Sequence, residues 1–553
     1  MATTIPLPLG SYVLVDPRAS CKRLIGCYGE TMDQDSPADY KSKANPATLR
    51  RMAGIKTIPG FSDGSGRPVR GMWEMAGVQY VVIGPNFYSV NFNPITFTAV
   101  LTRLNGTIPI TGNTFVRQAD NGACLVILDP GTSSAWTYSI GGGFQVLADP
   151  FFTSRGARDV WFVDSFIVFL SNVPPSNGGY GTLTFFNDDG RTTSGNFQIT
   201  FTSQASFSRE FGTDPFIGGA VDHREIIIIG SRTAEGFLNA GNSPGTPFGS
   251  APDSFMEIGC HKLAAYSVAK QDQSVFWVAN DSTVRRRNGQ TPTRVSNAGI
   301  EIILATSDLT GCYALTPTIN SHPMWILTMP NALSPDGYTG RTIGYDCLTQ
   351  KWFELESFGQ GSWRPLCYYN GFGDLQLMGD ALSDVTGALD QKTFTEYGAI
   401  QRCEFTSQSI YDGHNRITHR RIEVIATVGL GPGVASTFNT DRRLLETSDF
   451  RLLETGTGSS SPLGAVRLLE SSTSGTFQAL YAPLLDMFVS DDGGHTFESF
   501  SDPQTLGTQS QFDQRTVWFN LGQTRDRVYK WRVTDQTPLF TVDIQATLEG
   551  GKW

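Results

Sequence analysis

A short motif near the C terminus has residue types and a spacing that define one local geometry. Ser490, Asp492, Gly494, Thr496 and Phe497 fit the pattern S-x-D-x-G-x-T-F, the Asp-box. An aspartate at this place accepts hydrogen bonds from the N–H groups of a turn, glycine permits a positive φ, and an aromatic ring packs beneath the turn. We therefore expect a hairpin turn with a structural role. A sialidase-type site would also need an arginine triad, which the spacing does not assemble.

The densest basic cluster is Arg285-Arg286-Arg287. Alternate side chains of a strand point to opposite faces, so Arg285 and Arg287 would share one face and Arg286 the other. Two interpretations are open. The cluster is either a solvated strand edge paired with acids of a neighbouring subunit, or a surface that faces DNA or another partner.

Other residues that could do chemistry do not form a pattern. Asp188 and Asp189 lack the spacing of an EF-hand and indicate a hairpin turn. Residues 241–245 match G-x-S-x-G by letter, but Pro244 follows the serine and offers no N–H to an oxyanion hole. The six histidines show no zinc-binding spacing, and no phosphate-binding loop is present. We therefore predict no catalytic residue, metal or cofactor, and no enzyme.

The composition predicts the kind of scaffold that carries these residues. The 553 residues include 59 Gly and 29 Pro, and only 17% are charged. Short apolar runs separated by Gly, Pro and Asn turns are typical of an all-β protein. The net charge of −10 argues against a protein that grips DNA with its whole surface, although an acidic wall still lets DNA pass.

Hairpin-sized units recur through the first two thirds of the chain. Strand–turn–strand patterns follow one another between residues 69 and 390 at a spacing of roughly 40 to 50 residues, the size of a propeller blade. We predict a β-propeller over residues 61–400 with six or seven blades. Six is preferred, because the first and last hairpins could share a blade. Residues 1–60 are expected to form an extended N-terminal segment, with one short helix near residues 46–52.

The chain changes character beyond residue 400. Longer alternating strands with fewer repeats predict an antiparallel, β-sandwich-like domain over residues 401–553. It contains an octad insertion, residues 440–474, whose clear copies begin at Arg443, Arg451 and Arg467. The copies form either a ladder of stacked short strands or a duplicated surface loop.

The cysteines and the N-terminal sequence predict the cellular compartment in which the protein folds. The eight cysteines are dispersed without a CxxC pair, which predicts buried free thiols of a protein folded in a reducing cytoplasm. The N terminus shows no signal-peptide pattern, and no apolar run reaches the ~20 residues that span a membrane. We therefore expect a soluble protein that is not exported by the usual route.

The order of several motifs resembles one protein family. Residues 259–301 combine a Gly-Cys block, VFWVxNDxTV, an Asn-Gly turn and S-x-x-G-I-E. Residues 226–241, Pro59-Gly60 and residues 515–532 add further similar segments. Together they resemble the packaged-DNA stabilisation (tail accessory or tail hub) proteins of short-tailed bacteriophages. The triple arginine and the octad insertion depart from that pattern.

The resemblance implies a structural virion protein of the tail, assembled in the host cytoplasm. It implies a ring, usually a homohexamer, below the portal and adaptor proteins. That ring would retain packaged DNA, conduct double-stranded DNA during ejection, and dock tail fibres or a tail needle. The alternative, based on the Asp-box, is a propeller that binds or depolymerises carbohydrate, which would require paired carboxylates about a pocket.

Overall fold

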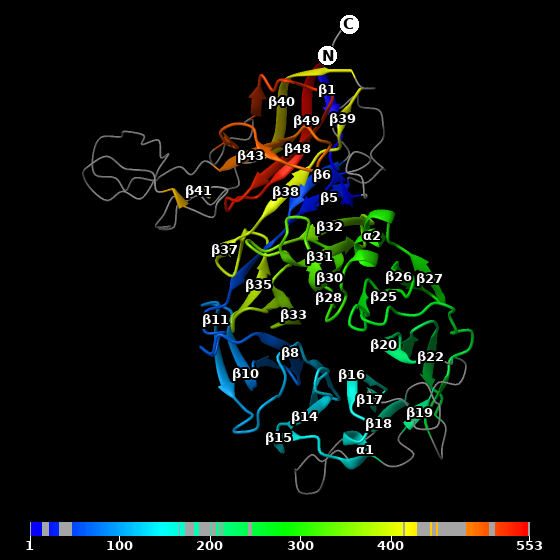
Figure 1. Ribbon diagram of the computed structural model, residues 1–553. Helices are drawn as coiled ribbons and strands as arrows, with labels where there is room; N and C mark the ends of the chain where they lie inside the picture. The colour runs from blue at the N-terminus through cyan, green and yellow to red at the C-terminus, as the bar shows by residue number, and fades with distance from the viewer. Residues whose placement is uncertain are drawn as a thin grey trace, which may run out of the picture. The chain divides into compact units, whose positions relative to one another are not determined.

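Strands dominate the computed structural model (Figure 1), which describes residues 2–13, 21–31, 47–164, 166–171, 182–186, 201, 206–208, 212, 214–241, 246–412, 415–427, 443–444, 450–451, 483–507 and 515–550. The chain divides into two compact units. The propeller unit comprises Gly10–Asp16 and Met52–Gln401, and the sandwich unit comprises Met1–Leu9, Pro17–Arg51 and Arg402–Trp553. The prediction of an all-β chain is confirmed.

Five blades of the propeller are separate four-stranded antiparallel sheets. Their strands follow the chain order from one edge of each sheet to the other. The first blade holds β8 (Val69–Met75), β9 (Val78–Ile83), β10 (Asn86–Asn93) and β11 (Thr98–Arg103), and the second holds β12 (Arg117–Asp120), β13 (Cys124–Asp129), β14 (Ser134–Ser139) and β15 (Gly143–Val146). The third holds β16 (Ala157–Val163), β17 (Phe166–Ser171), β18 (Thr182–Phe186) and β19 (Ser206–Ser208). The fourth holds β20 (Phe216–Asp222), β21 (Glu225–Gly230), β22 (Ala234–Asn239) and β23 (Phe248–Ser250), and the fifth holds β24 (Ala269–Gln271), β25 (Ser274–Val278), β26 (Val284–Asn288) and β27 (Thr291–Arg294).

Two more four-stranded groups continue the series. The sixth runs in the order β28 (Tyr313–Leu315), β30 (His322–Leu333), β31 (Thr339–Asp346) and β32 (Lys351–Leu355), with β29 (Thr318–Ile319) paired to β30. The seventh runs in the order β33 (Pro365–Gly371), β34 (Leu375–Asp380), β35 (Thr386–Asp390) and β7 (Gly54–Thr57). The described residues therefore contain seven four-stranded groups, which matches the alternative count and not the preferred count of six.

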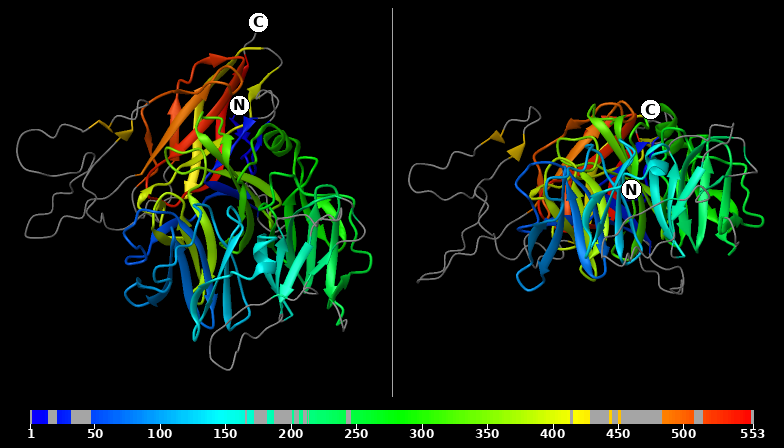
Figure 2. Two further views of the ribbon diagram at one scale, coloured as in Figure 1. Left: turned by 60° about the horizontal axis from the view of Figure 1, so that its bottom comes forward. Right: turned by 90° about the horizontal axis from the view of Figure 1, so that it is seen from below.

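The ring closes through β7, which precedes the first blade in the chain. It pairs antiparallel with β35, with Gly54 opposite Asp390 and Thr57 opposite Gly387. The hairpin of β36 (Thr395–Glu396) and β37 (Ala399–Ile400) adds to the other side of β7. In Figure 1 the colour runs around the ring from blue through cyan and green to yellow-green, and the two ends of this series adjoin. Figure 2 shows the same blades from two further directions.

The propeller core lies between successive blades. Both faces of a blade pack against neighbours, so the central strands are buried throughout and mostly apolar instead of alternating: every residue of β13 (CLVILD) and of β25 (SVFWV) is buried. One apolar cluster joins the first and seventh blades, including Val69, Val81 and Leu377. Burial on both faces explains why the sequence shows continuous apolar runs.

The sandwich unit contains two antiparallel sheets. One has the order β46 (Arg515–Phe519), β40 (Ile417–Thr427), β49 (Phe540–Gly550), β6 (Ala47–Arg51) and β5 (Cys27–Thr31), with β1 (Ala2–Ile5) on β49 and β47 (Gln523–Thr524) on β40. The other has the order β4 (Leu24–Ile25), β38 (Cys403–Thr406), β48 (Asp526–Val533), β43 (Leu484–Ser490) and β44 (Glu498–Ser499), with β39 (Ile410–Tyr411) on β48 and β45 (Gln504–Thr505) on β43. Buried side chains from both sheets, such as Ile422 and Trp531, form its core.

Residues 1–60 do not behave as one segment. β1, β4, β5 and β6 are strands of the sandwich unit, whereas β7 belongs to the propeller unit. The short helix expected near residues 46–52 is wrong, because these residues form β6 and pair with β5 and β49. Partners supplied by distant parts of the chain therefore decide the local structure.

The remaining elements are small. β2 (Tyr12–Val13) lies in the propeller unit and β3 (Cys21–Lys22) in the sandwich unit. The two described helices, α1 (Pro150–Thr153) and α2 (Ala298–Thr306), fall short of the length and apolar character that crossing a membrane would need. In the octad insertion, β41 (Arg443–Leu444) pairs antiparallel with β42 (Phe450–Arg451), and the rest lies outside the described residues. All seven cysteines whose side chains are described are free and buried.

Candidate functional sites

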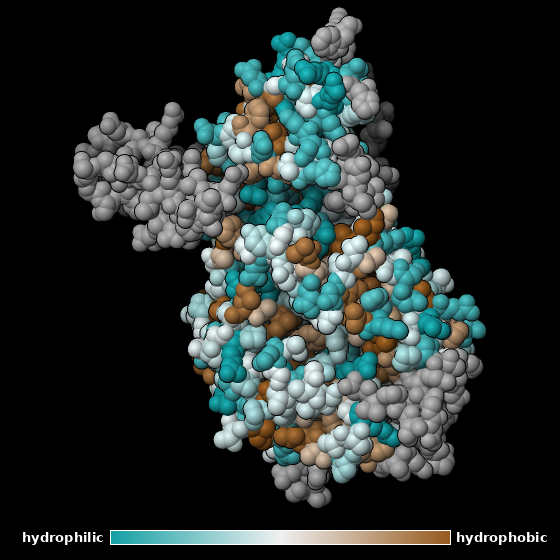
Figure 3. Space-filling model, in the orientation of Figure 1, coloured by the Kyte–Doolittle hydropathy of each residue, from teal (hydrophilic) through white to brown (hydrophobic). Residues whose placement is uncertain are grey.

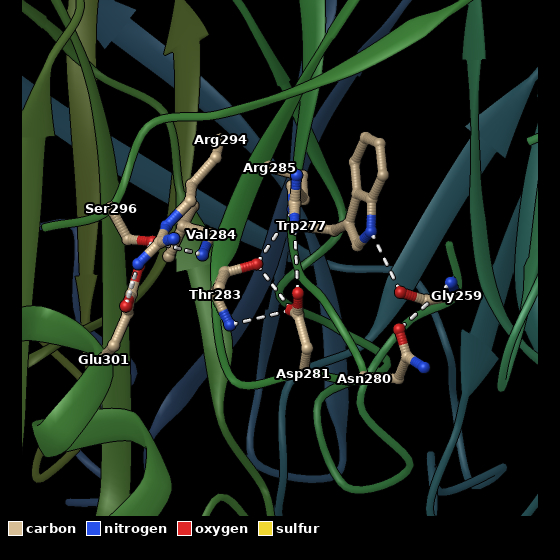
Figure 4. A network of polar contacts seen from close by, with 10 residues as sticks. All are labelled: Gly259, Trp277, Asn280, Asp281, Thr283, Val284, Arg285, Arg294, Ser296 and Glu301. Atoms are coloured by element: carbon tan, nitrogen blue, oxygen red, sulfur yellow. Dashed lines mark hydrogen bonds and ion pairs between the residues drawn. The ribbon is translucent and has the colours of Figure 1, made fainter. Parts of the chain in front are cut away.

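The basic cluster lies on β26, an inner strand of the fifth blade. Its neighbour β25 anchors the blade: the indole N–H of Trp277 donates to the Gly259 carbonyl oxygen at 3.2 Å, and the Asn280 side chain accepts from the Gly259 N–H at 3.3 Å. Figure 4 shows these contacts beside the pairs of Arg285 and Arg294. The Gly-Cys block and the VFWV strand of the sequence are therefore one packed structural unit.

Arg285 is paired within its own hairpin. Its Nη2 lies 2.9 Å from Asp281 Oδ2, and its Nε donates to Thr283 Oγ1 at 2.9 Å. Asp281 also accepts from the Thr283 N–H at 3.1 Å. Burial acts to raise the pKa of Asp281, but the hydrogen bonds from Thr283 and Arg285 hold that pKa below its usual value. The pair closes the turn between β25 and β26 (Figure 4).

Arg286 points to the opposite face. Its Nη2 lies 2.8 Å from Asp272 Oδ2, and its guanidinium carbon lies 5.4 Å from the centre of the Phe276 ring. Phe276 belongs to the apolar cluster that the fifth and sixth blades share. Arg286 therefore covers the edge of that inter-blade core.

Arg287 is the most deeply buried of the three arginines, with 7% of its surface exposed. Its Nη2 lies 3.0 and 2.8 Å from the two carboxylate oxygens of Glu225 on β21 of the fourth blade. This ion pair joins neighbouring blades. The two faces expected from alternation are present, since Arg287 faces the fourth blade while Arg286 faces the sixth.

Each arginine of the cluster therefore has an acidic partner in the same chain. The three partners are Asp281, Asp272 and Glu225. Only Asp281 lies close enough in sequence, four residues from Arg285, to be recognised without a structure. The neighbouring Arg294 has a comparable pair with Glu301 of α2, which Ser296 also contacts at 2.6 Å (Figure 4). What the exposed side of the cluster faces stays a prediction.

The Asp-box residues form a closed turn between β43 and β44. Asp492 accepts from the Ser490 hydroxyl at 2.6 Å, the Thr496 hydroxyl at 2.6 Å, and the N–H groups of His495 and Thr496 at 2.9 and 3.0 Å. The Gly494 N–H donates to Ser490 Oγ at 2.8 Å, and Gly494 has φ of +102°. Phe497 lies beneath Lys530, whose Nζ is 4.4 Å from the ring centre.

These bonds fix the protonation state of the Asp-box. Burial acts to raise the pKa of Asp492, but the hydrogen bonds from Ser490 and Thr496 hold that pKa well below the usual range. A carboxylate with so many donors is a turn clip and a poor proton donor or nucleophile. The arrangement can therefore hold the β43–β44 hairpin.

A partly buried polar network lies next to the Asp-box, and the sequence pattern gave no sign of it. Arg527 on β48 forms a two-bond ion pair with Asp491, at 2.5 and 2.6 Å. His419 on β40 is 1% exposed, and its Nδ1 lies 2.7 Å from the hydroxyl of Tyr529. Burial, and secondarily the charge of Arg527, lower the pKa of His419 to about 4. Arg527 and Asp491 are 36 positions apart and His419 and Tyr529 are 110 positions apart, so no local pattern could have shown these contacts.

The other residues singled out by the sequence give no site. Asp188, Asp189 and residues 242–245 lie outside the described residues. Within the described part of the chain, no group of three or more His, Cys, Asp or Glu side chains is arranged to hold a metal ion. His322 is buried and paired with Asp346 at 2.8 Å, inside the sixth blade.

Seven radial four-stranded groups closed by a strand from the N-terminal side define a β-propeller protein. A family model described as "Bacteriophage P22 Gp10, beta-propeller" matches residues 38–394, more than half of the chain. The chain belongs to this family of phage structural proteins, and the resemblance stated from the sequence is confirmed.

Other comparisons are weaker. No curated protein sequence matches the chain. Similar solved structures include the WD40 β-propeller domain of Doa1, with 8% identity, a TM-score of 0.35, and coverage of 61% of this chain and 97% of that one. A computationally designed protein, Ika8, has 13% identity, a TM-score of 0.33, and coverage of 61% and 100%. The extracellular domain of BT4673 from B. thetaiotaomicron has 11% identity, a TM-score of 0.39, and coverage of 87% and 60%. These TM-scores are below 0.5, so the likenesses carry no argument.

Proposed function

We propose that this phage structural protein forms the nozzle or hub ring of a short tail. In this proposal identical subunits, six in number, form a ring below the portal and adaptor. The ring retains packaged DNA, conducts it during ejection, and docks fibres or a needle. The observation that carries the proposal is the family match, which covers almost all of the propeller.

The rigidity of the propeller suits a protein that forms the wall of a tube. Both faces of the central strands are buried, and the ring is closed by β7, so the unit has few ways to deform. A tube for DNA needs rigid walls and no catalysis. We therefore propose that the protein is not an enzyme.

The surface chemistry supports a wall that contacts partners and does not hold DNA tightly. The net charge is −10, and each arginine of the basic cluster is paired within the chain. Figure 3 shows apolar residues in separate patches on the visible face of the propeller. Strongly exposed apolar side chains, such as Ile95 (93%) and Leu333 (68%), are natural contacts for partner subunits.

The alternative of a carbohydrate-binding or depolymerising tail protein has less support. It rested on the Asp-box, and Asp492 there is occupied by turn hydrogen bonds. A glycan site would need a second feature elsewhere in the chain.

The test is the mass of the purified protein in solution, followed by electron microscopy alone and with portal–adaptor particles. A ring that docks coaxially on the adaptor supports the proposal, as does a monomer that assembles only on the particle. A monomer that ignores the particle and cleaves a host glycan would overturn it.

The basic cluster offers a sharper test. Charge reversal of Arg285 and Arg286, with Arg294→Glu as the matched control on the next strand, should weaken ring assembly or genome retention if the cluster faces a subunit or DNA. Unchanged assembly and retention would remove the cluster from the interface.

A further inference from the structure

Two thiols lie against each other inside the sandwich unit. Cys27 on β5 is 1% exposed and Cys403 on β38 is 0% exposed, and the two thiols are close enough for each to shift the pKa of the other. Cys27 Sγ also lies 3.3 Å from the carbonyl oxygen of Glu404. The pair connects residues 376 positions apart in the chain.

Gly26 makes this close approach possible. β4 pairs with β38 through Ile25 opposite Glu404, and the chain then passes to β5, in the other sheet, at Gly26 with φ of +61°. A Cβ on Gly26 would lie 2.1 Å from the Arg402 carbonyl oxygen and 3.6 Å from the Cys403 Cα. Only glycine fits such contacts, and the next residue is therefore held beside Cys403.

The surroundings make the two thiols chemically unequal. The neighbouring Cys27 thiol lowers the pKa of Cys403. The same contact, with burial, raises the pKa of Cys27. The guanidinium of Arg51, 3% exposed, favours the thiolate of both. Cys403 is thus the better nucleophile, and Cys27 is placed to attack an oxidised Cys403.

We propose that Cys27 and Cys403 are a redox pair, and that a small peroxide converts them into a disulfide that locks β5 to β38. The Cys403 thiolate attacks hydrogen peroxide, which yields a sulfenic acid on Cys403 and hydroxide. The Cys27 thiol then attacks the sulfenic sulfur, and one water leaves as the S–S bond forms. Overall, two thiols lose two electrons and two protons, and one peroxide becomes two waters.

The bond would form late in the life of the protein. Inside a reducing cytoplasm the pair stays reduced, and release from the cell removes that protection. Burial restricts the reaction to an oxidant of about the size of peroxide, or to moments when β4 and β5 open. The disulfide would join the chain before the propeller to the chain after it. The inference concerns only the sandwich unit and does not depend on the proposed place in the tail.

The experiment counts thiols in the full-length protein. The reduced protein is treated with hydrogen peroxide, quenched, denatured, and alkylated with N-ethylmaleimide. Of the eight cysteines, we expect eight alkylated sites before treatment and six after it, with a peptide cross-link between Cys27 and Cys403. Dithiothreitol should restore eight sites. Amide exchange in β4 and β5 should be slower in the oxidised protein.

Variants assign the roles of the two thiols. Cys27→Ser should trap the sulfenic acid on Cys403, which dimedone captures, whereas Cys403→Ser should give neither dimedone adduct nor cross-link. Cys124→Ser, a buried cysteine of the second blade, is the matched control and should still lose two thiols. Eight intact thiols after a dose that oxidises the denatured protein, or cross-links between other cysteines, would overturn the proposal. Mapping the cross-linked peptides of the protein without substitutions tests the proposal even if a variant does not fold.

Discussion

Acidification should destabilise the sandwich unit through one histidine. His419 is 1% exposed, its Nδ1 contacts Tyr529, and among the described residues its Nε2 has no hydrogen-bond partner. Burial and Arg527 lower the pKa of its imidazole to about 4 in the folded protein. In the unfolded chain a histidine titrates near 6.5. The unfolded state therefore binds a proton first as the pH falls.

The sign and size follow from this difference. Above pH 6.5 the imidazole is mostly neutral in both states, so the depressed pKa costs little stability there. As the pH falls from about 6.5 towards about 4, the unfolded chain binds a proton that the folded protein does not, and the free energy of unfolding decreases. At 1.36 kcal/mol per pKa unit, the full loss is about 3 kcal/mol, and about 2 kcal/mol of it falls between pH 6.5 and 5. In the sandwich unit the pKa values of Glu404 and Asp492 are held below their usual range, so these carboxylates contribute little in that window.

The assay is urea-dependent amide exchange read on peptides of β40 and β48, at pH 6.5, 5.8 and 5.0. A local reporter is needed because two units need not unfold in one transition. His419→Gln removes the titrating group, so its peptides should show a much flatter pH dependence than those of the unmodified protein. The matched control is His223→Gln, which replaces an exposed histidine in a turn of the propeller. It should leave the slope unchanged.

The reasoning fails if the His419→Gln protein keeps the full pH slope. The slope would then come from other groups, and the buried imidazole would have to be accommodated in its protonated form. A slope that disappears with the control variant would be equally damaging.

Three further predictions follow from the ion pairs, the turn and the ring closure. Asp492→Ala removes the acceptor of the Asp-box, so the free energy of unfolding should fall by about 1–3 kcal/mol, with faster amide exchange confined to the β43–β44 hairpin. Arg287→Ala leaves Glu225 buried without its partner and should cost about 3–5 kcal/mol, whereas Arg285→Ala, at a partly exposed pair, should cost less than about 1 kcal/mol in urea unfolding. Equal costs would contradict this ranking. Ile55→Asp places a charge at a fully buried position of the closing strand and should cost more than about 4 kcal/mol, with exchange of β35 as the readout. Unaltered protection of β35 would show that β7 does not hold the ring.

The sequence predicts what depends on near neighbours. The Asp-box was recognisable because its donors and acceptors lie within seven residues, from Ser490 to Thr496. The all-β class was recognisable because turns interrupt every apolar run. In contrast, the pairing of β7 with β35 joins residues more than three hundred positions apart. The sequence of Gly54–Thr57 does not indicate which strand it pairs with. The preferred blade count failed for this reason.

Long-range pairing also explains the other differences between the sequence-based predictions and the structure. The sequence predicts a short helix near residues 46–52, but the partners of residues 47–51 on β5 and β49 make them a strand. The acid that pairs with Arg287 lies on another blade, and the contact of His419 with Tyr529 joins two sheets. Such contacts need a register, which local spacing does not supply.

The closure of the ring has a consequence for the ancestry of the chain. Apart from Gly10–Asp16, the propeller unit is one continuous segment, Met52–Gln401. Its two ends meet: the side-chain amide of Gln401 donates to the carbonyl oxygens of Met52 and Ala53 at 3.2 and 3.1 Å. A segment whose ends adjoin can be cut out or replaced by recombination without separating the strands on either side of it. The propeller segment is therefore an insertion between two parts of the sandwich unit. Relatives could exchange the propeller while keeping the sandwich unit, or the reverse.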